Sequence, residues 1–362
     1  MNAATEFDLG PLTWVKGEID AALDRAGEAL GQFREDKDAT KLKFCRTHIH
    51  QVRGALAIVG LDGVTQVTEA LEDLLSKLEV ESGNATDEML GVVERAVSAI
   101  RQYLDDLMAG EPNQPLRLLS VYRALNEARG AARIRPSDLF FPDLSIRPPK
   151  RVEPVARLSP EEFRASLKRE RMRFQKGLLS WLRHPAGTLA VQSQTQMLEA
   201  LNAIEATQET PAARSFWWVA QGFIDALSDP EVAAVQDTRQ LCARIDLQIR
   251  RLLEGSRNVA ERLSRDALYY VGLSSADSGR GLAPAIRSSF QLEGLVPKGE
   301  VVQTTAPQEL ALRRLREVIV ATEELWNKFC AGSAAALPGF AEQAKNCAQS
   351  TVAVGNTDLK RL

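Results

Sequence analysis

The strongest candidate for chemistry is His50, which lies in the string His-Ile-His-Gln-Val-Arg-Gly at positions 48–54. Apolar residues at three- and four-residue spacing over positions 42–59 predict a helix and mark its buried side. At 100° per residue, His50 lies about 130° from the centre of that side and therefore faces solvent. Gly54 and Ala57 lie within about 40° of His50, so small residues surround the ring. The spacing therefore predicts an exposed nucleophile on a surface that a partner can approach.

This arrangement suits phosphoryl transfer to imidazole. A neutral histidine carries a lone pair at physiological pH and needs no strong base. The phosphorylated product gains up to about two negative charges, which Arg53, one helical turn later, would help to hold. Lys43 and Arg46 lie at the edge of the same surface, and Gly54 leaves room for a partner to close over the ring.

A hydrogen-bond acceptor at the other ring nitrogen would fix the tautomer and orient the reactive nitrogen. Two carboxylates on the next antiparallel helix are candidates for this role, Glu69 and Glu72. Reasoning from the residues alone leaves the choice between them open.

The string His50-Gln51-Val52-Arg53-Gly54, with Gly60 ten residues after the histidine, resembles the signature H-x-x-K-G-x5-G of histidine phosphotransfer (HPt) domains. This resemblance implies a four- or five-helix bundle whose histidine exchanges phosphoryl groups with aspartates of response regulators. In CheA-type members a glutamate 22 residues after the histidine accepts its hydrogen bond, which here is Glu72. The position 19 residues after it, often a second histidine, is Glu69. Arg53 replaces the signature lysine, which keeps the charge but changes its geometry.

Further strings extend the resemblance along the chain: Trp14-Val15-Lys16-Gly17-Glu18-Ile19, Leu139-Phe140-Phe141-Pro142-Asp143-Leu144, Phe216-Trp217-Trp218-Val219-Ala220 and Ala267-Leu268-Tyr269-Tyr270. With them, most of the chain resembles the N-terminal HPt-containing region of the large type IV pilus chemotaxis kinases, the ChpA/PilL group of CheA-like hybrid histidine kinases, and the related FimL scaffold. The resemblance implies CheY-like receiver domains as partners, and a CheA-type kinase core in cis or in trans.

No Gly-rich ATP lid and no kinase asparagine box occur in the sequence. The chain thus resembles part of a sensor histidine kinase without its ATP-binding core, and whether it is an enzyme stays open. We expect either an N-terminal fragment of a longer kinase or a short stand-alone relative.

The elements that position His50 follow from apolar residues spaced by three or four. Four amphipathic segments and a shorter fifth are separated by polar or Gly- and Pro-containing turns, and they cover positions 12–33, 42–59, 64–78, 89–108 and 116–129. This pattern predicts an antiparallel HPt-type bundle of four or five helices over residues 1–131.

A Pro- and Arg-rich linker is predicted over residues 132–160, which contain six of the sixteen prolines. We expect it to be extended and semi-rigid, with Leu139-Phe140-Phe141-Pro142 docked on the first bundle. Residues 161–280 predict a second, HPt-like helical bundle without an H-x-x-[KR]-G string, and hence a scaffold or docking module. Its helices are expected over positions 164–183, 188–207, 212–227, 230–253 and 259–271. Residues 281–362 predict further helices, the start of a third module. No long stretch alternates with period two, so the fold class is all-α.

Composition excludes several classes of protein. Lys and Arg number 45 against 48 Asp and Glu, so the chain lacks the general basic footprint of a nucleic-acid binder. Three histidines and four cysteines without C-x-x-C spacing argue against a metal centre or a disulfide framework, and no cofactor motif is found. The absence of a signal sequence and of an apolar run of membrane-spanning length predicts a cytoplasmic protein without membrane insertion.

Several other features have two interpretations. His48 is expected to be a half-buried packing residue rather than the phosphoacceptor, and His184 to end a helix. The aromatic string Phe216-Trp217-Trp218 is either a ligand-binding cluster or, as we expect, core. The basic run over 164–176 either binds an acidic partner or, because Glu161, Glu162 and Glu170 interleave with it, forms a solvated helix face.

The sequence therefore predicts a histidine phosphotransfer module of a two-component phosphorelay in type IV pilus chemotaxis and twitching motility. His50 would carry the phosphoryl group to or from response-regulator aspartates. The alternative is a degenerate HPt-like scaffold that binds receiver or pilus-pole proteins without phosphotransfer.

Overall fold

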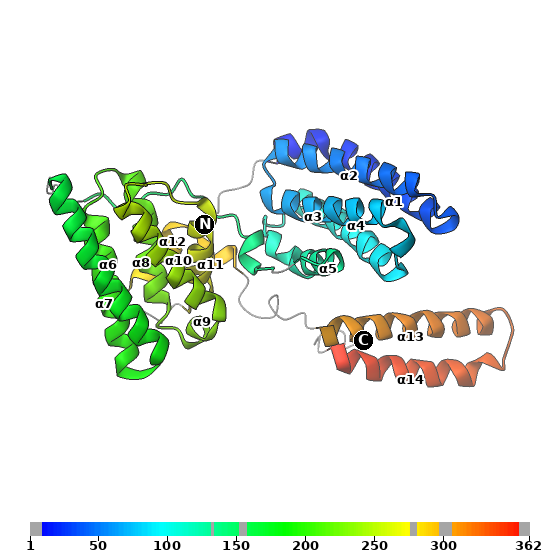
Figure 1. Ribbon diagram of the computed structural model, residues 1–362. Coiled ribbons are helices and arrows are strands. Elements are labelled where there is room, and N and C mark those ends of the chain that lie inside the picture. Colours follow the sequence, from blue (N-terminus) through cyan, green and yellow to red (C-terminus); the bar gives the residue numbers. More distant parts are fainter. Residues whose placement is uncertain (1–8, 132–133, 152–157, 276–280, 297–305, 355–362) are drawn as a thin grey trace. The chain divides into compact units, whose positions relative to one another are not determined.

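The computed structural model describes residues 9–131, 134–151, 158–275, 281–296 and 306–354 (Figure 1). These residues form fourteen α-helices and four short 3-10 helices, and no strand occurs among them. The all-α fold class predicted from the sequence is confirmed.

The first bundle consists of five helices and two 3-10 turns among the described residues. The helices and the second turn are α1 (Gly10–Asp36), α2 (Ala39–Val59), α3 (Asp62–Val80), α4 (Asp87–Met108), η2 (Pro115–Leu118) and α5 (Leu119–Arg129). The first turn, η1 (Ser82–Asn84), precedes α4. Helix α2 packs between α1 and α3, while α4 packs on α1 and on α5 (Figure 1).

Local signals determine where α2 begins and ends. The Asp38 side chain accepts a hydrogen bond from the backbone N–H of Thr40 and caps the N-terminus. Gly60 ends the helix in the left-handed conformation at φ 80°, which a glycine adopts without a Cβ clash. Between these ends the apolar stripe is fully buried, through Leu42, Cys45, Ile49, Val52 and Leu56. Burying each such side chain contributes about 1.5–3 kcal/mol, which fixes the rotation of the helix about its axis.

The segment that links the two bundles is packed, and part of it is helical. Pro136–Leu139 form the 3-10 turn η3, which differs from the extended linker that the sequence predicts. Leu139 and Phe140 are buried. The predicted docking on the first bundle is present, because η3 contacts α3. The segment also contacts the second bundle, where the Phe140 ring lies 5.7 Å from the Tyr269 ring.

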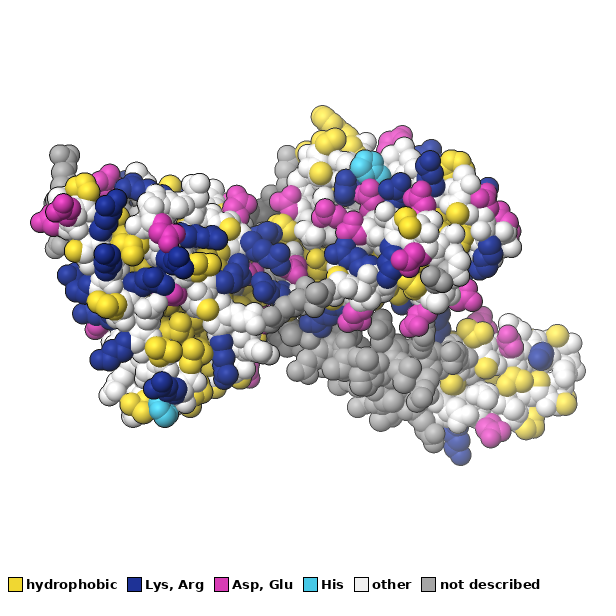
Figure 2. Space-filling model, viewed as in Figure 1, with side chains coloured by type: hydrophobic (Ala, Val, Ile, Leu, Met, Phe, Trp, Pro, Cys, Tyr) yellow, Lys and Arg dark blue, Asp and Glu magenta, His cyan; other side chains and the backbone are white. Residues whose placement is uncertain are grey.

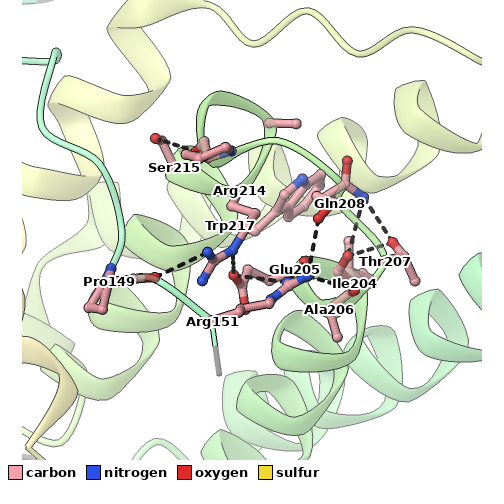
Figure 3. Close-up of polar contacts among 12 residues, drawn as sticks. Pro149, Arg151, Ile204, Glu205, Ala206, Thr207, Gln208, Arg214, Ser215 and Trp217 are labelled. Atoms are coloured by element: carbon pink, nitrogen blue, oxygen red, sulfur yellow. Dashed lines mark hydrogen bonds and ion pairs between the residues drawn. The ribbon is translucent and has the colours of Figure 1, made fainter. Parts of the chain in front are cut away.

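The end of this segment is held by an arginine cluster on the second bundle (Figure 3). Arg151 donates hydrogen bonds to the backbone carbonyls of Ala206 and Gln208 at 3.0 and 3.1 Å, and it pairs with the Glu205 carboxylate at 3.1 Å. Arg214 pairs with the same carboxylate and donates to the backbone carbonyl of Pro149 at 3.1 Å. Arg151 thus satisfies carbonyls at a helix C-terminus, which has no intrahelical donors for them.

The described residues of the second bundle form seven α-helices. They are α6 (Pro160–Arg183), α7 (Gly187–Ala206), α8 (Pro211–Ala226), α9 (Pro230–Ala234), α10 (Gln236–Leu253), α11 (Glu261–Leu273) and α12 (Leu282–Ser289), followed by the 3-10 turn η4 (Leu292–Gly294). Phe216, Trp217 and Trp218 are buried, as are Tyr269 and Tyr270, so these aromatic strings are core.

Two details of this bundle differ from the sequence prediction. A single helix was expected over 230–253, but Val235 is extended and separates α9 from α10. Neither proline nor glycine marks that position, so composition carries no signal for the break. Helix α12 was not delimited in advance, and its first backbone N–H groups, those of Leu282 and Ala283, are capped by the buried Asp225 of α8. Asp225 lies more than fifty residues before the helix that it caps, so the sequence around the start of α12 does not reveal this cap.

The chain divides into two compact units, Met1–Lys298 and Gly299–Leu362. Within the second unit, α13 (Ala306–Cys330) and α14 (Ala336–Val354) pack against each other as a helical hairpin (Figure 1). Among the described residues, no helix is both long enough and apolar enough to cross a membrane.

Candidate phosphoacceptor site

His50 lies near the middle of α2, with its imidazole on the exposed side of the helix. The side chain is 61% exposed, whereas the neighbouring Ile49 and Val52 are fully buried. Because the buried stripe fixes the rotation of α2, the opposite face must project into solvent. The structure therefore places His50 where the sequence analysis expected it.

Glu72 of α3 is the carboxylate that reaches the imidazole. The distance from His50 Nδ1 to Glu72 Oε1 is 2.9 Å, and the Glu72 side chain is only 15% exposed. The second carboxylate oxygen, Oε2, pairs with Arg53 Nη1 at 3.1 Å. One carboxylate thus links the histidine of the signature to the arginine that follows it by one turn.

These contacts define which imidazole nitrogen can react. An ionised carboxylate only accepts hydrogen bonds, so Nδ1 must carry the proton and donate it to Glu72. Nε2 then keeps its lone pair. Arg53 Nη2 lies 3.4 Å from Nδ1, but both groups are donors in this tautomer, so this proximity is not a hydrogen bond. The site therefore presents Nε2 as the nucleophilic atom.

Glu69, the other candidate acceptor, is exposed on α3 and accepts a hydrogen bond from Gln66 at 3.2 Å. Among the described residues, Glu69 forms no hydrogen bond with His50. Of the cations expected at the edge of the surface, Arg46 pairs with Glu79 at 2.9 Å and Lys43 is exposed. Arg53 is thus the cation that the structure brings to the imidazole.

The surface around His50 is open on the side of Gly54. A Cβ atom at Gly54 would meet nothing within 4 Å, so the fold itself does not require glycine there. Ala57 is exposed on the same side, and so is Ile58, whose side chain is 86% exposed. Ile58 is not among the residues predicted for the site. In the sequence it could have been recognised as an aliphatic residue that lies outside the buried stripe of α2.

The other histidines and Cys45 have different surroundings. His48 is half-buried, as expected, and its Nδ1 lies 3.3 Å from the side-chain oxygen of Gln51. His184 follows the last residue of α6 and is exposed. Cys45 belongs to the buried stripe, and burial raises the pKa of its thiol to about 12. A thiol with so high a pKa is a poor nucleophile at neutral pH.

Comparisons with known proteins agree with this geometry. Residues 12–109, which include His50, Arg53, Glu69 and Glu72, match the family model described as Hpt domain. Residues 159–303 match the model described as FimL scaffold protein second domain. Over 290 residues the chain is 27% identical to the scaffold protein FimL of Pseudomonas aeruginosa, an alignment that covers 79% of this chain and 50% of the relative.

The chain thus spans about half the length of the curated relative that it matches. No solved structure matches it significantly. The two domain matches lie in the order predicted for the bundles, and together with the similarity to FimL they support a FimL-related chain with an Hpt domain at residues 12–109.

Proposed function

We propose that this chain is the phosphotransfer module of a two-component phosphorelay, with His50 as the phosphoacceptor. The observation that carries the proposal is the hydrogen bond between His50 Nδ1 and Glu72, made by an imidazole whose side chain is 61% exposed. The bond orients the ring and leaves Nε2 free toward a partner. The match of residues 12–109 to the Hpt domain supports this assignment.

In the proposed reaction, His50 Nε2 attacks the phosphorus of an aspartyl phosphate on a receiver domain. The N–P bond forms as the P–O bond to aspartate breaks, and the aspartate leaves as a carboxylate. The positive charge that develops on the ring is stabilised by Glu72, which keeps the Nδ1 proton hydrogen-bonded. The reverse reaction returns the phosphoryl group to a receiver aspartate, and a CheA-type kinase core supplies it from ATP.

Arg53 and Gly54 have supporting roles in this proposal. Arg53 lies one turn from His50 and, although paired with Glu72, can contribute positive charge beside the phosphoryl oxygens. Gly54 leaves open space next to the ring, and the exposed Ala57 and Ile58 extend a smooth surface onto which a receiver can dock. The similarity to FimL supports placing this relay in type IV pilus chemotaxis and twitching motility.

The decisive experiment measures transfer of labelled phosphoryl to the protein. The full chain is incubated with a phosphorylated CheY-like receiver, or with a CheA-type kinase and ATP, from its own organism. The wild type is expected to acquire label that is acid-labile and base-stable, as phosphohistidine is. His50→Gln is expected to lose it. His48→Gln, two residues away on the same helix, is the matched control and is expected to retain it.

A second candidate function is a scaffold that binds receivers or pilus-pole proteins without phosphotransfer. The match of residues 159–303 to the second domain of a scaffold protein favours it. Absence of label in the wild type, with receiver binding retained in His50→Gln, would establish the scaffold and reject the relay.

A further inference from the structure

Helix α6 of the second bundle carries a basic surface that the phosphorelay does not use. Between positions 163 and 184 it contains seven Arg or Lys residues and one acidic residue, Glu170. From the sequence, the basic run either binds an acidic partner or, as the interleaved glutamates favour, forms a solvated helix face. In the structure Glu170 points inward, with its side chain 4% exposed, and pairs with Arg169 and Arg173.

The remaining glutamates lie at the start of α6. Glu162 is part of a capping box, in which its side chain accepts a hydrogen bond from the backbone N–H of Ser159 at 2.8 Å. Glu161 lies in the first turn, where a carboxylate compensates the positive end of the helix dipole. The glutamates of α6 therefore form no ion pair with three cations of its exposed face, Lys168, Lys176 and Arg183.

That exposed face is an ordered stripe of cationic and aliphatic side chains, which we call the α6 stripe. It consists of Lys168, Met172, Lys176, Leu179 and Arg183, and all five are exposed. At 100° per residue they fall within about 80° of arc and extend about 22 Å along the helix. The inward residues, among them Leu167, Phe174 and Trp181, are centred on the opposite side.

The α6 stripe lacks partners in the described part of the chain. Lys168, Lys176 and Arg183 form no ion pair among the described residues, in contrast to Arg171, which pairs with Asp246 at 2.9 Å. Between these cations, the Met172 and Leu179 side chains are 64% and 57% exposed. Figure 2 shows Lys and Arg side chains gathered over the α6 side of this bundle, with hydrophobic side chains among them.

We propose that the α6 stripe is the docking site for an acidic amphipathic helix of a partner protein. Carboxylates of that helix would pair with Lys168, Lys176 and Arg183, and its aliphatic residues would cover Met172 and Leu179. This surface goes beyond the proposed phosphotransfer, because it lies on the second bundle and none of its residues contributes to the His50 site.

Spacing distinguishes a helical partner from an anionic membrane. The members of the α6 stripe follow one another at intervals of three or four residues, so they form one ridge of the kind that fits the groove of another helix. Carboxylates at similar intervals on that helix can meet each cation. A bilayer would instead require a broad apolar face, but the broad apolar face of α6 is buried in the bundle.

The test uses the full chain and a synthetic probe. The probe is a fluorescein-labelled helical peptide of about 24 residues, long enough to cover the α6 stripe, with glutamate at four-residue spacing beside a leucine stripe. Fluorescence anisotropy is expected to show saturable binding that weakens as salt is raised. Lys168→Glu combined with Lys176→Glu and Arg183→Glu is expected to weaken binding at least about tenfold, because three exposed ion pairs are replaced by repulsion.

A matched control reverses three exposed arginines outside the α6 stripe, Arg95→Glu, Arg251→Glu and Arg257→Glu, and is expected to change the affinity less than about twofold. A second variant, Met172→Ser with Leu179→Ser, retains every charge and is expected to weaken binding measurably. All substituted side chains are exposed, so circular dichroism is expected to remain that of the wild type.

Equal binding by the stripe variant and the wild type, or equal binding of a scrambled acidic peptide, would reject the proposal. Sedimentation with anionic lipid vesicles that depends on the α6 stripe, without binding of the peptide, would assign this surface to membranes instead. Phosphoryl transfer to His50 is measured on the same variants. It is expected to equal that of the wild type, because the α6 stripe shares no residue with the His50 site.

Discussion

At His50, one neighbouring carboxylate determines which imidazole nitrogen is available. A histidine 61% exposed would otherwise exchange between tautomers in water. Glu72 removes that freedom, because it is largely buried and lies 2.9 Å from Nδ1. In the proposed phosphotransfer, the reactivity of His50 would therefore depend on a carboxylate that lies mostly below the surface.

Removing this carboxylate is expected to slow phosphotransfer without unfolding the bundle. Glu72→Ala should lower the transfer rate from a phosphorylated receiver by about 10- to 100-fold, the usual effect of losing a group that orients a reactive histidine. Glu69→Ala is the matched control, since it removes the same side chain from the same helix, and it should leave the rate unchanged. Equal rates for the two variants would contradict the role given to Glu72.

The cysteines offer a second test at the residue scale. Burial raises the pKa of the Cys45 thiol to about 12 and raises that of Cys242 as well, whereas Cys330 is exposed. Because the thiolate is the reactive form, an aromatic disulfide reagent should modify Cys330 rapidly in the native protein. Cys45 and Cys242 should react only after denaturation, even at pH 9. Rapid modification of either in native Cys330→Ser would show that the core is more open than described.

Two glycines of α2 have opposite effects on the helix that carries the site. Gly54 lies inside the helix with open space around it, whereas Gly60 ends the helix at φ 80°. A side chain is unstrained at position 54, whereas at position 60 the left-handed backbone strains most side chains other than asparagine. The two substitutions to alanine therefore separate the stability of α2 from its function.

Gly54→Ala is expected to stabilise the protein by up to about 1 kcal/mol, because alanine is the better helix former and no neighbour is displaced. The same methyl group stands beside His50, so binding of a receiver and phosphotransfer should weaken. Chemical denaturation and the labelling experiment measure the two effects. A stabilised variant with undiminished transfer would show that the open space at Gly54 is not used by the partner.

Gly60→Ala is expected to lower the free energy of unfolding by about 1–2 kcal/mol, because alanine pays a steric cost in the left-handed conformation. Gly60→Asn should lose less, since asparagine tolerates this conformation better. Denaturant titration of both variants and the wild type measures the free energies of unfolding that are compared. Equal stability of Gly60→Ala and the wild type would contradict the left-handed conformation of Gly60 at the end of α2.

At the scale of the whole molecule, residues 134–151 between the bundles are held by polar contacts. Ser137 donates a hydrogen bond to the buried Asp266 at 2.7 Å, and Asp138 pairs with Arg262. Further along, Arg151 and Arg214 share Glu205 (Figure 3). A segment with so many prolines would remain a spacer without these contacts, because it has little regular structure of its own.

Removal of Glu205 is expected to loosen this segment. The Glu205 side chain is 12% exposed, so Glu205→Ala leaves two largely buried arginines without their shared carboxylate. We expect a loss of about 2 kcal/mol in unfolding free energy and faster proteolysis within residues 134–151. Glu199→Ala, on the same helix but 58% exposed, is the control and should behave like the wild type. Unchanged proteolysis in Glu205→Ala would show that other contacts hold the segment.

The sequence by itself determined the helices and the orientation of α2. Helical periodicity is a local property, so the stripe through Leu42 and Leu56 was sufficient to predict that Ile49 is buried and His50 exposed. The same reasoning predicted the aromatic core of the second bundle. It failed at Val235, where no residue type marks the break between two helices.

Only the tertiary structure decided which charged groups meet. Glu69 and Glu72 are three residues apart on α3, and the rotation and axial offset of α3 against α2 select Glu72 for His50. Packing likewise turns Glu170 inward, where it pairs with Arg169 and Arg173. Lys168, Lys176 and Arg183 are left exposed on α6 without an ion pair among the described residues. Residue spacing determines the face on which a side chain lies, but the neighbouring helix that it meets depends on packing between segments distant in sequence.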